Sequence, residues 1–244
     1  MAGVRGKTKL PGEYRKSQNW IGGATLQDAV FIPPHHSEVA ALMGDLENFL
    51  HNDRIQLPDL MRIAMAHYQF ETIHPFLDGN GRLGRLLITL YLVSNNILSN
   101  PTLYLSAYFE KHKAVYYDNL MRARTANDVL QWIRFFLVAV TETARQGIAT
   151  FKSILVLRED IESRRLITLG KKLPRAQQLV NHLYKSPKVT AADVGTMLDV
   201  TPATANVFIQ DFVKLGILRE TTGGRRNRIF TFHEYLSLFA DAGR

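Results

Sequence analysis

The stretch HPFLDGNGRLGR, residues 74–85, contains the most informative pattern in this chain of 244 residues. It places a histidine, a carboxylate, a Gly-Asn-Gly turn and two arginines within one short segment. Gly79 and Gly81 permit left-handed backbone dihedrals, which turn successive N–H groups toward one point and predict an anion-binding nest. The apolar residues that follow have helical spacing, so a helix should begin at about Gly81 or Arg82 with its positive end near the anion.

The charged side chains of this stretch suit a metal-bound polyphosphate. Arg82 and Arg85 lie three positions apart and share a helix face, so both guanidinium groups can reach the same oxygens. Asp78 can hold Mg²⁺ together with substrate phosphates, and His74 can take a proton from a hydroxyl group. Singly, these residues are typical of turns and solvated helix ends; the complete block predicts a site. Phe76 should anchor the loop in the core.

The stretch resembles the signature of the Fic-domain family, His-x-Phe-x-(Asp/Glu)-Gly-Asn-Gly-Arg-x-x-Arg, and meets every fixed position. The resemblance implies a protein adenylyltransferase, which moves AMP from ATP to a Ser, Thr or Tyr hydroxyl of a target protein or of the chain itself. It makes His74 the catalytic base and Asp78 the Mg²⁺ ligand. The nucleotide-binding residues that it implies in this stretch are Asp78, Gly79, Asn80, Gly81, Arg82, Leu83, Gly84 and Arg85.

Within this resemblance, each part of the stretch has a role in binding phosphate. The backbone N–H groups of residues 79–81 and the side chain of Asn80 would bind the α-phosphate, and the two arginines would bind the outer phosphates. The same site could instead remove AMP, or transfer UMP, phosphate or phosphocholine. A nucleotide-sensing, DNA-binding regulator is the alternative outside the enzymes. The complete motif favours an enzyme.

The composition agrees with a globular protein that binds acidic partners. The formal net charge is +8, 46% of the residues are hydrophobic, and there is no cysteine, which excludes disulfides and thiolate metal sites. No apolar run approaches the ~20 residues needed to span a bilayer, and no apolar segment follows the basic residues near the start. We therefore expect a cytoplasmic protein without a membrane partner.

The chain divides by pattern into three segments, 1–35, 36–170 and 171–244. The first should contain a β-hairpin with strands at 20–24 and 29–32, stopped by two prolines. The second should be helical, with Ser37 as the first N-cap. Helices are expected at residues 37–50, 57–73, 106–123, 126–147 and 148–169, in addition to the motif helix. The fold class is therefore mainly α, a Fic-type helical core with a hairpin.

Two features outside the motif extend the resemblance. Residues 12–35 resemble the flap of larger Fic proteins, which implies that a target segment docks there by β-augmentation. The nucleotide would then be bordered by Asp28, Ala29, Val30 and Phe31. Without the motif, an ordinary solvent-facing hairpin would be preferred. In the family an aromatic pair lines the adenine pocket, and Tyr116 and Tyr117 stand in the corresponding place, although core packing explains them equally well.

Residues 171–244 resemble a winged helix, a small α+β domain. Helices are expected at about 175–184, 190–198 and 201–215, followed by strands at 217–222 and 228–232. The segment contains 11 Lys and Arg against 6 Asp and Glu, a balance of +5. Arg225, Arg226 and Arg228 could contact the phosphates of DNA, but the third helix has a single basic residue. Winged helices also serve as docking and dimerisation modules, so DNA and a homodimer both remain open.

Control of the site is the last expectation. Larger family members commonly carry an upstream helix with a (Ser/Thr)-x-x-x-Glu-(Gly/Asn) motif, whose Glu pairs with the second motif arginine, here Arg85. This sequence has no such motif before residue 74, and its opening resembles the middle of a longer family member. We expect the inhibitory segment to lie outside this sequence or on another chain.

Overall fold

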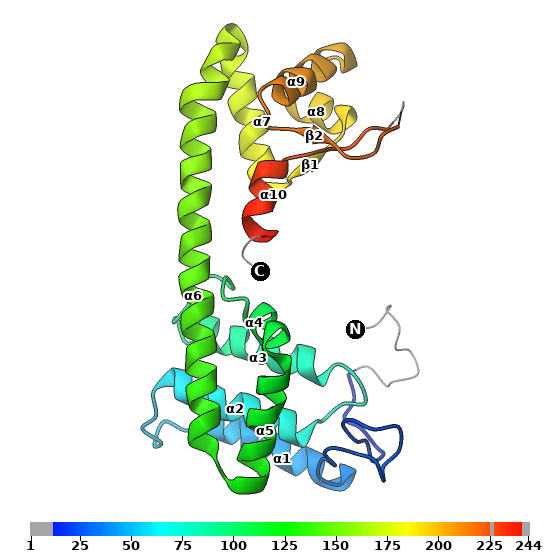
Figure 1. Cartoon of the computed structure of the whole chain (residues 1–244), viewed down its shortest axis with the longest axis vertical. Helices are drawn as coiled ribbons and strands as arrows, with labels where there is room; N and C mark the ends of the chain where they lie inside the picture. Colours follow the sequence, from blue (N-terminus) through cyan, green and yellow to red (C-terminus); the bar gives the residue numbers. More distant parts are fainter. Residues whose placement is uncertain (1–11, 225–226, 241–244) are drawn as a thin grey trace. The chain divides into compact units, whose positions relative to one another are not determined.

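The computed structural model describes residues 12–224 and 227–240 and is mainly helical. Backbone contacts divide the chain into two compact units, residues 1–144 and 145–244 (Figure 1). Arg225 and Arg226, which the sequence offers as phosphate contacts, lie outside the described residues. Within the described part of the chain, no helix has both the length and the apolar character that crossing a bilayer demands.

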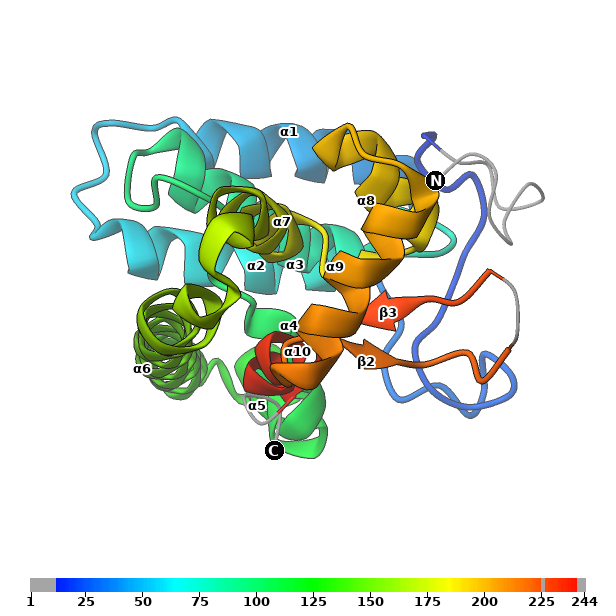
Figure 2. The ribbon, with the colours of Figure 1, turned by 90° about the horizontal axis from the view of Figure 1, so that it is seen from above.

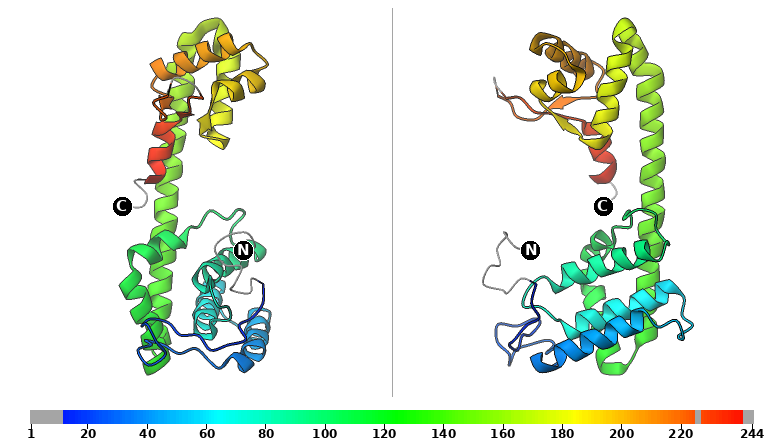
Figure 3. Two further views of the ribbon diagram at one scale, coloured as in Figure 1. Left: turned by 90° about the vertical axis from the view of Figure 1, so that its right-hand side faces the viewer. Right: turned by 180° about the vertical axis from the view of Figure 1, so that it is seen from behind.

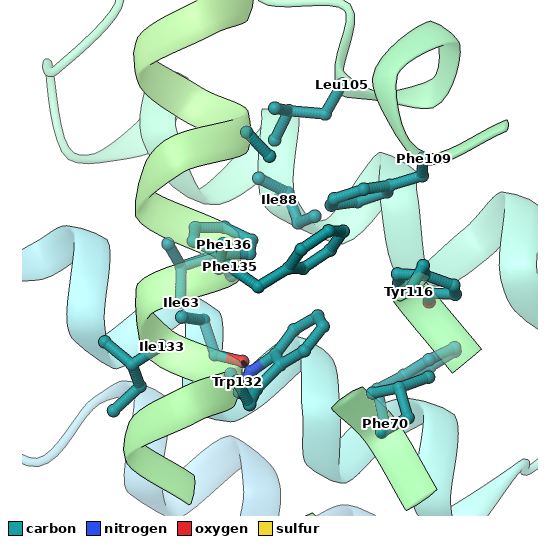
Figure 4. Packing of buried hydrophobic residues seen from close by; sticks show 14 of the residues in the cluster. Ile63, Phe70, Ile88, Leu105, Phe109, Tyr116, Trp132, Ile133, Phe135 and Phe136 are labelled. Atoms are coloured by element: carbon teal, nitrogen blue, oxygen red, sulfur yellow. Dashed lines mark hydrogen bonds between the residues drawn. The ribbon is translucent and has the colours of Figure 1, made fainter. Parts of the chain in front are cut away.

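The first unit is a helical bundle in which α2 contacts both α1 and α3. Its helices are α1 (Val39–Leu50), α2 (Asp59–Ile73), α3 (Asn80–Ser94), α4 (Leu105–Lys111), α5 (Lys113–Ala126) and the first part of α6 (Val129–Asp160). Buried aromatic rings fill the centre, with Trp132 and Phe136 of α6 completely enclosed (Figure 4). Trp132 donates its indole N–H to the carbonyl of Ala64 at 2.8 Å, which joins α6 to α2.

Several helix boundaries differ from the prediction. The helix expected at 106–123 is divided at His112 into α4 and α5, and α6 runs without interruption through Gly147. A Cβ at Gly147 would meet nothing within 4 Å, and a single glycine costs a helix only about 1 kcal/mol, so it does not end α6. Ser37 is not an N-cap: it lies inside a short 3-10 turn, His36–Glu38, which His35 caps by accepting from the Ser37 N–H.

The predicted hairpin is present only as a loop closed by one antiparallel bridge, Ile21–Phe31, so the two expected strands are wrong. The chain turns immediately after Ile21, because Gly22 and Gly23 both have left-handed dihedrals, with φ of 74° and 73°. A Cβ at Gly23 would overlap the carbonyl of Asp28, so a side chain at this position requires the turn to open. We call residues 12–35 the flap.

The second unit combines helices with a small sheet. After α6 come a π turn (Ile161–Arg165) and a 3-10 segment (Leu166–Lys172), and then a series of short elements. They are α7 (Leu173–Lys185), β1 (Lys188–Val189), α8 (Ala191–Leu198), α9 (Pro202–Lys214), β2 (Arg219–Glu220), β3 (Phe230–Thr231) and α10 (His233–Ala240). The sheet is antiparallel with the order β1-β3-β2, and Figure 2 shows β2 and β3 side by side.

Local signals in the second unit explain its elements well. Thr190 caps α8 in a reciprocal capping box with Asp193, and this helix lies where the sequence places one, at about 190–198. The two predicted strands are present but shortened to two residues each. The sequence analysis missed β1 and α10; α10 is fixed by Glu234, whose carboxylate receives a bidentate pair of bonds from Arg165 at 2.9 Å.

Candidate functional site

His74 forms the sharp turn between α2 and the motif loop. Pro75 disfavours helical dihedrals for the residue before it, so α2 ends at Ile73. His74 adopts a left-handed conformation, with φ 50° and ψ 59°. The His74 N–H still donates to the carbonyl of Phe70 at 3.0 Å, which fixes the turn to the helix. Its Nδ1 is buried and has no partner among the described residues, which leaves Nε2 as the nitrogen that a substrate can approach.

The surroundings of His74 favour its neutral form. Burial lowers the pKa of His74 to about 4; an interaction with the backbone of Glu71 opposes this shift, and the positive charges of Arg124 and Arg15 add to it. The imidazole is therefore unprotonated at neutral pH and is able to accept a proton.

The loop after His74 is closed from inside by Asn80. The Asn80 side-chain oxygen accepts from the Phe76 N–H at 2.9 Å, and its Nδ2 donates to the Phe76 carbonyl at 2.7 Å. Asn80 is buried, and both ends of its amide are engaged within the loop. Phosphate contact by this side chain, which the sequence analysis expected, stays a prediction.

The N-terminus of α3 provides free backbone donors. The helix begins at Asn80, one residue before the predicted start, and no side chain caps it. Only Gly79 has the left-handed dihedral expected of both glycines, with φ 87°; Gly81 is helical, because the chain has already entered α3. The N–H groups of the first turn therefore take the place of the predicted two-glycine nest as the candidate anion site.

Gly81 serves a different purpose in the structure. A Cβ at this position would lie 3.2 Å from Nη1 of Arg85, so the guanidinium of Arg85 lies over the first turn of α3. Among the described residues, no acidic side chain forms an ion pair with Arg85. The arginine and the free N–H groups of the helix thus offer positive charge to the same region.

Asp78 and Arg82 lie at the exposed edge of the site. Arg82 Nη2 is 3.7 Å from Asp78 Oδ2, and both side chains are more than half exposed. Such a pair contributes little free energy, so the carboxylate can turn toward a cation. The described residues contain no cluster of three or more His, Asp or Glu side chains that could hold a metal by itself.

The sequence analysis missed a buried polar cluster beneath the loop. The His67 Nδ1–H donates to the carbonyl of Gly84 at 2.9 Å, and Nε2 of His67 is 3.0 Å from the Tyr116 hydroxyl. Burial raises the pKa of Glu71 to about 7, against the opposing charges of Arg85 and Arg124. The signal that could have revealed the cluster is the spacing of His67 and Glu71, four positions apart on a helix face that is otherwise apolar.

Gly84 allows α2 and α3 to approach closely. A Cβ at Gly84 would overlap Oε1 of Glu71 and would lie 3.1 Å from Cδ1 of Phe70 and 3.2 Å from Cε1 of His67. The glycine therefore sets the distance between the helix that ends at His74 and the helix that begins at the motif. Its role in the structure is packing, although the resemblance places it among the nucleotide-binding residues.

The two tyrosines predicted for the adenine pocket, Tyr116 and Tyr117, differ in exposure. Tyr116 is buried and points into the aromatic core (Figure 4), so the structure does not present its ring to a nucleotide. Tyr117 is about half exposed and stays a prediction for the adenine pocket. Of the flap residues predicted to border the nucleotide, Asp28 and Val30 are exposed, and Phe31 stacks against Arg124 with 3.8 Å between the guanidinium carbon and the ring centre.

The base of the flap is bonded to the motif loop, beside the turn that precedes α3 (Figure 3). Arg15 is buried; its backbone N–H donates to the Pro75 carbonyl at 2.9 Å and its Nε to the His74 carbonyl at 3.0 Å. The Asn19 amide donates to the Phe76 carbonyl at 3.2 Å. The flap and the predicted catalytic loop are therefore neighbours, although about 60 residues separate them in the sequence.

Comparison with known proteins agrees with this arrangement. Residues 2–92 match the family model described as Fic/DOC family. The protein adenylyltransferase Fic of Drosophila erecta is 30% identical over 133 residues, which are 54% of this chain and 24% of that protein. The Aedes aegypti protein of the same name is 34% identical over 125 residues, 51% of this chain and 22% of that protein. The chain thus spans about a quarter of the length of these curated relatives.

A solved structure shows the same fold. A Fic family protein from Desulfovibrio desulfuricans G20 superposes with a TM-score of 0.54 and 23% identity, covering 95% of this chain and 65% of that one. Together with the motif, the family match and the curated relatives confirm the resemblance of residues 2–92 to the Fic/DOC family.

Proposed function

We propose that this chain is a protein adenylyltransferase that transfers AMP from ATP to a hydroxyl group of a target protein, including its own. The observation that carries the proposal is the neutral His74 at the end of α2, beside the uncapped start of α3 and the guanidinium of Arg85. The names of the curated relatives support the same activity.

The reaction follows from these positions. The target hydroxyl loses its proton to His74 Nε2, its oxygen forms a bond to the α-phosphorus, and the bond between that phosphorus and the bridging oxygen breaks to release pyrophosphate. The backbone N–H groups at the start of α3 stabilise the negative charge that grows on the α-phosphate oxygens. Arg85 and Arg82 bind the outer phosphates. We assign Asn80 to holding the loop in shape.

Asp78 would hold Mg²⁺ in this scheme. A single exposed carboxylate with a weak partner fits the usual mode of Mg²⁺, which takes one or two carboxylates, water and substrate phosphates. When bound, the ion would neutralise charge on the phosphates.

The flap is the proposed docking place for the target. Five large hydrophobic side chains of the flap are substantially exposed: Tyr14, Trp20, Leu26, Val30 and Ile32. Since the flap has a single bridge and no strand ladder, an extended target segment could pair with its backbone and cover these side chains.

The test is to incubate the protein with Mg²⁺ and either α-³²P-ATP or γ-³²P-ATP and to follow protein-bound label. Label from the α position alone indicates AMP transfer, and label from the γ position indicates phosphate transfer. His74→Ala should abolish transfer while ATP affinity measured by calorimetry changes little, because the base is needed for attack and not for holding phosphates. His51→Ala, an exposed histidine after α1, is the matched control. Undiminished transfer by His74→Ala would refute the assignment of the base.

For residues 171–244 we propose a winged-helix-like module that binds DNA, supported by one hollow in its surface. The hollow, of about 440 Å³, is lined by the first residues of α8, by Asn206 of α9 and by Arg228 of the hairpin. Asn206 and Gln210 lie four positions apart on the exposed face of α9. The side-chain amide of Gln210 suits an adenine edge, and that of Asn206 donates to the Pro202 carbonyl at 2.9 Å.

This second proposal is tested by fluorescence anisotropy with a labelled DNA duplex at 50 and 150 mM salt. Binding should weaken steeply with salt, and Arg228→Ala should weaken it further, whereas Lys152→Ala on α6 should have little effect. Absence of binding at 50 mM salt, or equal effects of the two substitutions, would refute it.

A further inference from the structure

Arg124 of α5 joins three separate parts of the first unit through one side chain. Its Nε donates to the Thr72 hydroxyl and its Nη2 to the Glu71 carbonyl, both at 3.1 Å. The same guanidinium stacks on the ring of Phe31, with 3.8 Å between its carbon and the ring centre. A single planar group thus bonds to the last turn of α2 in its plane and to the flap through its face.

One end of this connection lies in the turn before His74, and the other lies in the bridge of the flap. Glu71 and Thr72 precede His74 by three and two residues, in the turn that fixes its left-handed conformation. At the other end, Phe31 forms the bridge of the flap: its N–H donates to the Ile21 carbonyl at 3.1 Å, and its carbonyl accepts from the Ile21 N–H at 2.9 Å. Movement of the bridge therefore acts on the guanidinium that holds the turn.

We call residues 21–32 the tip of the flap and residues 12–20 and 33–35 its base. The tip and the base are connected to the His74 turn in different ways. At the base, Arg15 is buried and bonds to the carbonyls of His74, Pro34 and Ser17, so this connection is part of the core. At the tip, the ring of Phe31 is the contact with Arg124, and the neighbours of Phe31, Val30 and Ile32, are at least half exposed. A segment that docks on the tip would reach Phe31 without displacing Arg15.

We propose that Arg124 is a positioning residue that couples occupancy of the flap to the orientation of His74. This inference rests on the proposed adenylyl transfer. A target segment that pairs with the flap tip orders the Ile21–Phe31 bridge and presses the Phe31 ring on the guanidinium. Arg124 then holds the last turn of α2, and with it His74, in the orientation that accepts the hydroxyl proton. Lysine could not replace it, because an ammonium group lacks the planar fork that bonds and stacks at once.

The experiment measures hydrogen exchange and transfer in the whole chain. Phe31→Leu removes the ring but none of the bonds from Arg124 to α2, and Arg124→Gln removes the guanidinium. Each should accelerate exchange of the Ile21 and Phe31 amides, and also of the distant His74 amide, by about tenfold, the size expected for loss of one partly desolvated stack. Self-modification at saturating ATP should slow by a similar factor with unchanged ATP affinity. Arg124→Lys should resemble Arg124→Gln.

Arg122→Gln is the matched control, because Arg122 lies on the same helix and is exposed, with Asp128 as its ion-pair partner. It should leave exchange and transfer unchanged. The double variant Phe31→Leu/Arg124→Gln should be no worse than either single variant, since both break one connection. Additive effects, or an unchanged His74 amide in Phe31→Leu, would overturn the inference. Because exchange does not depend on turnover, an inactive wild-type protein would refute the proposed function and still leave the coupling testable. If Arg124→Gln does not fold, Phe31→Leu decides the outcome alone.

Discussion

The motif loop and the flap touch each other, but they are held in opposite ways. In the loop, Asn80 is buried and bonds to both backbone groups of Phe76, and Pro75 and His74 are fixed by the end of α2. In the flap tip, the backbone is held by the Ile21–Phe31 bridge and by two turn hydrogen bonds, from the N–H groups of Asp28 and Ala29, and Val30 is 64% exposed. The part proposed to stabilise charge is therefore preorganised, and the part proposed to receive a protein segment is adaptable.

The largest effect should come from breaking the support beneath the loop. Gly84→Val places a branched side chain against Glu71, Phe70 and His67, so α2 and α3 must separate. We expect a loss of about 3 kcal/mol in the free energy of unfolding, the upper range for overpacking. Urea denaturation followed by circular dichroism measures it.

Gly44→Ala in α1 is the control for Gly84→Val, since a Cβ at Gly44 would meet nothing within 4 Å. It should stabilise the protein by about 0.5–1 kcal/mol through helix propensity. An unchanged urea midpoint for Gly84→Val would mean that the helices are not locked at this contact.

The next effect concerns pH and tests whether the buried Glu71 carboxyl is shielded from water. The pKa of Glu71 is raised from its ordinary 4.5 to about 7. The contribution of its neutral carboxyl to the free energy of unfolding is therefore complete below pH 4.5 and is lost as pH rises through 7, where the buried carboxyl ionises. Glu71→Gln cannot ionise. Its free energy of unfolding relative to wild type should therefore rise by about 2–3 kcal/mol between pH 5 and pH 8.5.

Urea titrations at both pH values measure the effect of Glu71→Gln. Glu47→Gln, an exposed position on α1, should show no such change. A difference between Glu71→Gln and wild type that is constant with pH would show that the carboxylate is already charged and stabilised in the folded protein.

The sequence predicted what depends on neighbours along the chain. The spacing of the motif placed the start of α3 within one residue, and the helix expected at about 190–198 corresponds to α8, which a Thr190 capping box begins. Both depend on backbone dihedrals and hydrogen bonds between residues three or four positions apart, which a local pattern encodes.

The sequence could not show which way side chains point between elements. Asn80 bonds to the backbone of Phe76, and Tyr116 packs in the core, because only the tertiary structure decides which face is covered. Arg15 and Arg124 reach the turn at His74 from positions more than 50 residues away along the chain. A sequence pattern marks an isolated arginine as a solvated side chain, so contacts of this kind emerge only from the fold.

The smallest effect sharpens the opening comparison with one substitution made in each region. Gly79 of the loop and Gly23 of the flap are both left-handed, with φ of 87° and 73°, so alanine introduces about 1 kcal/mol of backbone strain at either place. In the loop this strain cannot relax, because Asn80 holds the adjacent residues; Gly79→Ala should lower the free energy of unfolding by about that amount and weaken ATP binding.

In the flap, the clash with Asp28 can be relieved by local opening, so Gly23→Ala should change global stability by less than about 0.5 kcal/mol. It should instead accelerate exchange of the Val30 and Phe31 amides and slow transfer to a protein target more than it weakens ATP binding. Gly12→Ala, left-handed but with open space around its Cβ position, separates strain from the clash. If Gly23→Ala and Gly79→Ala destabilise the whole protein equally, the flap is as rigid as the loop and the contrast between them is wrong.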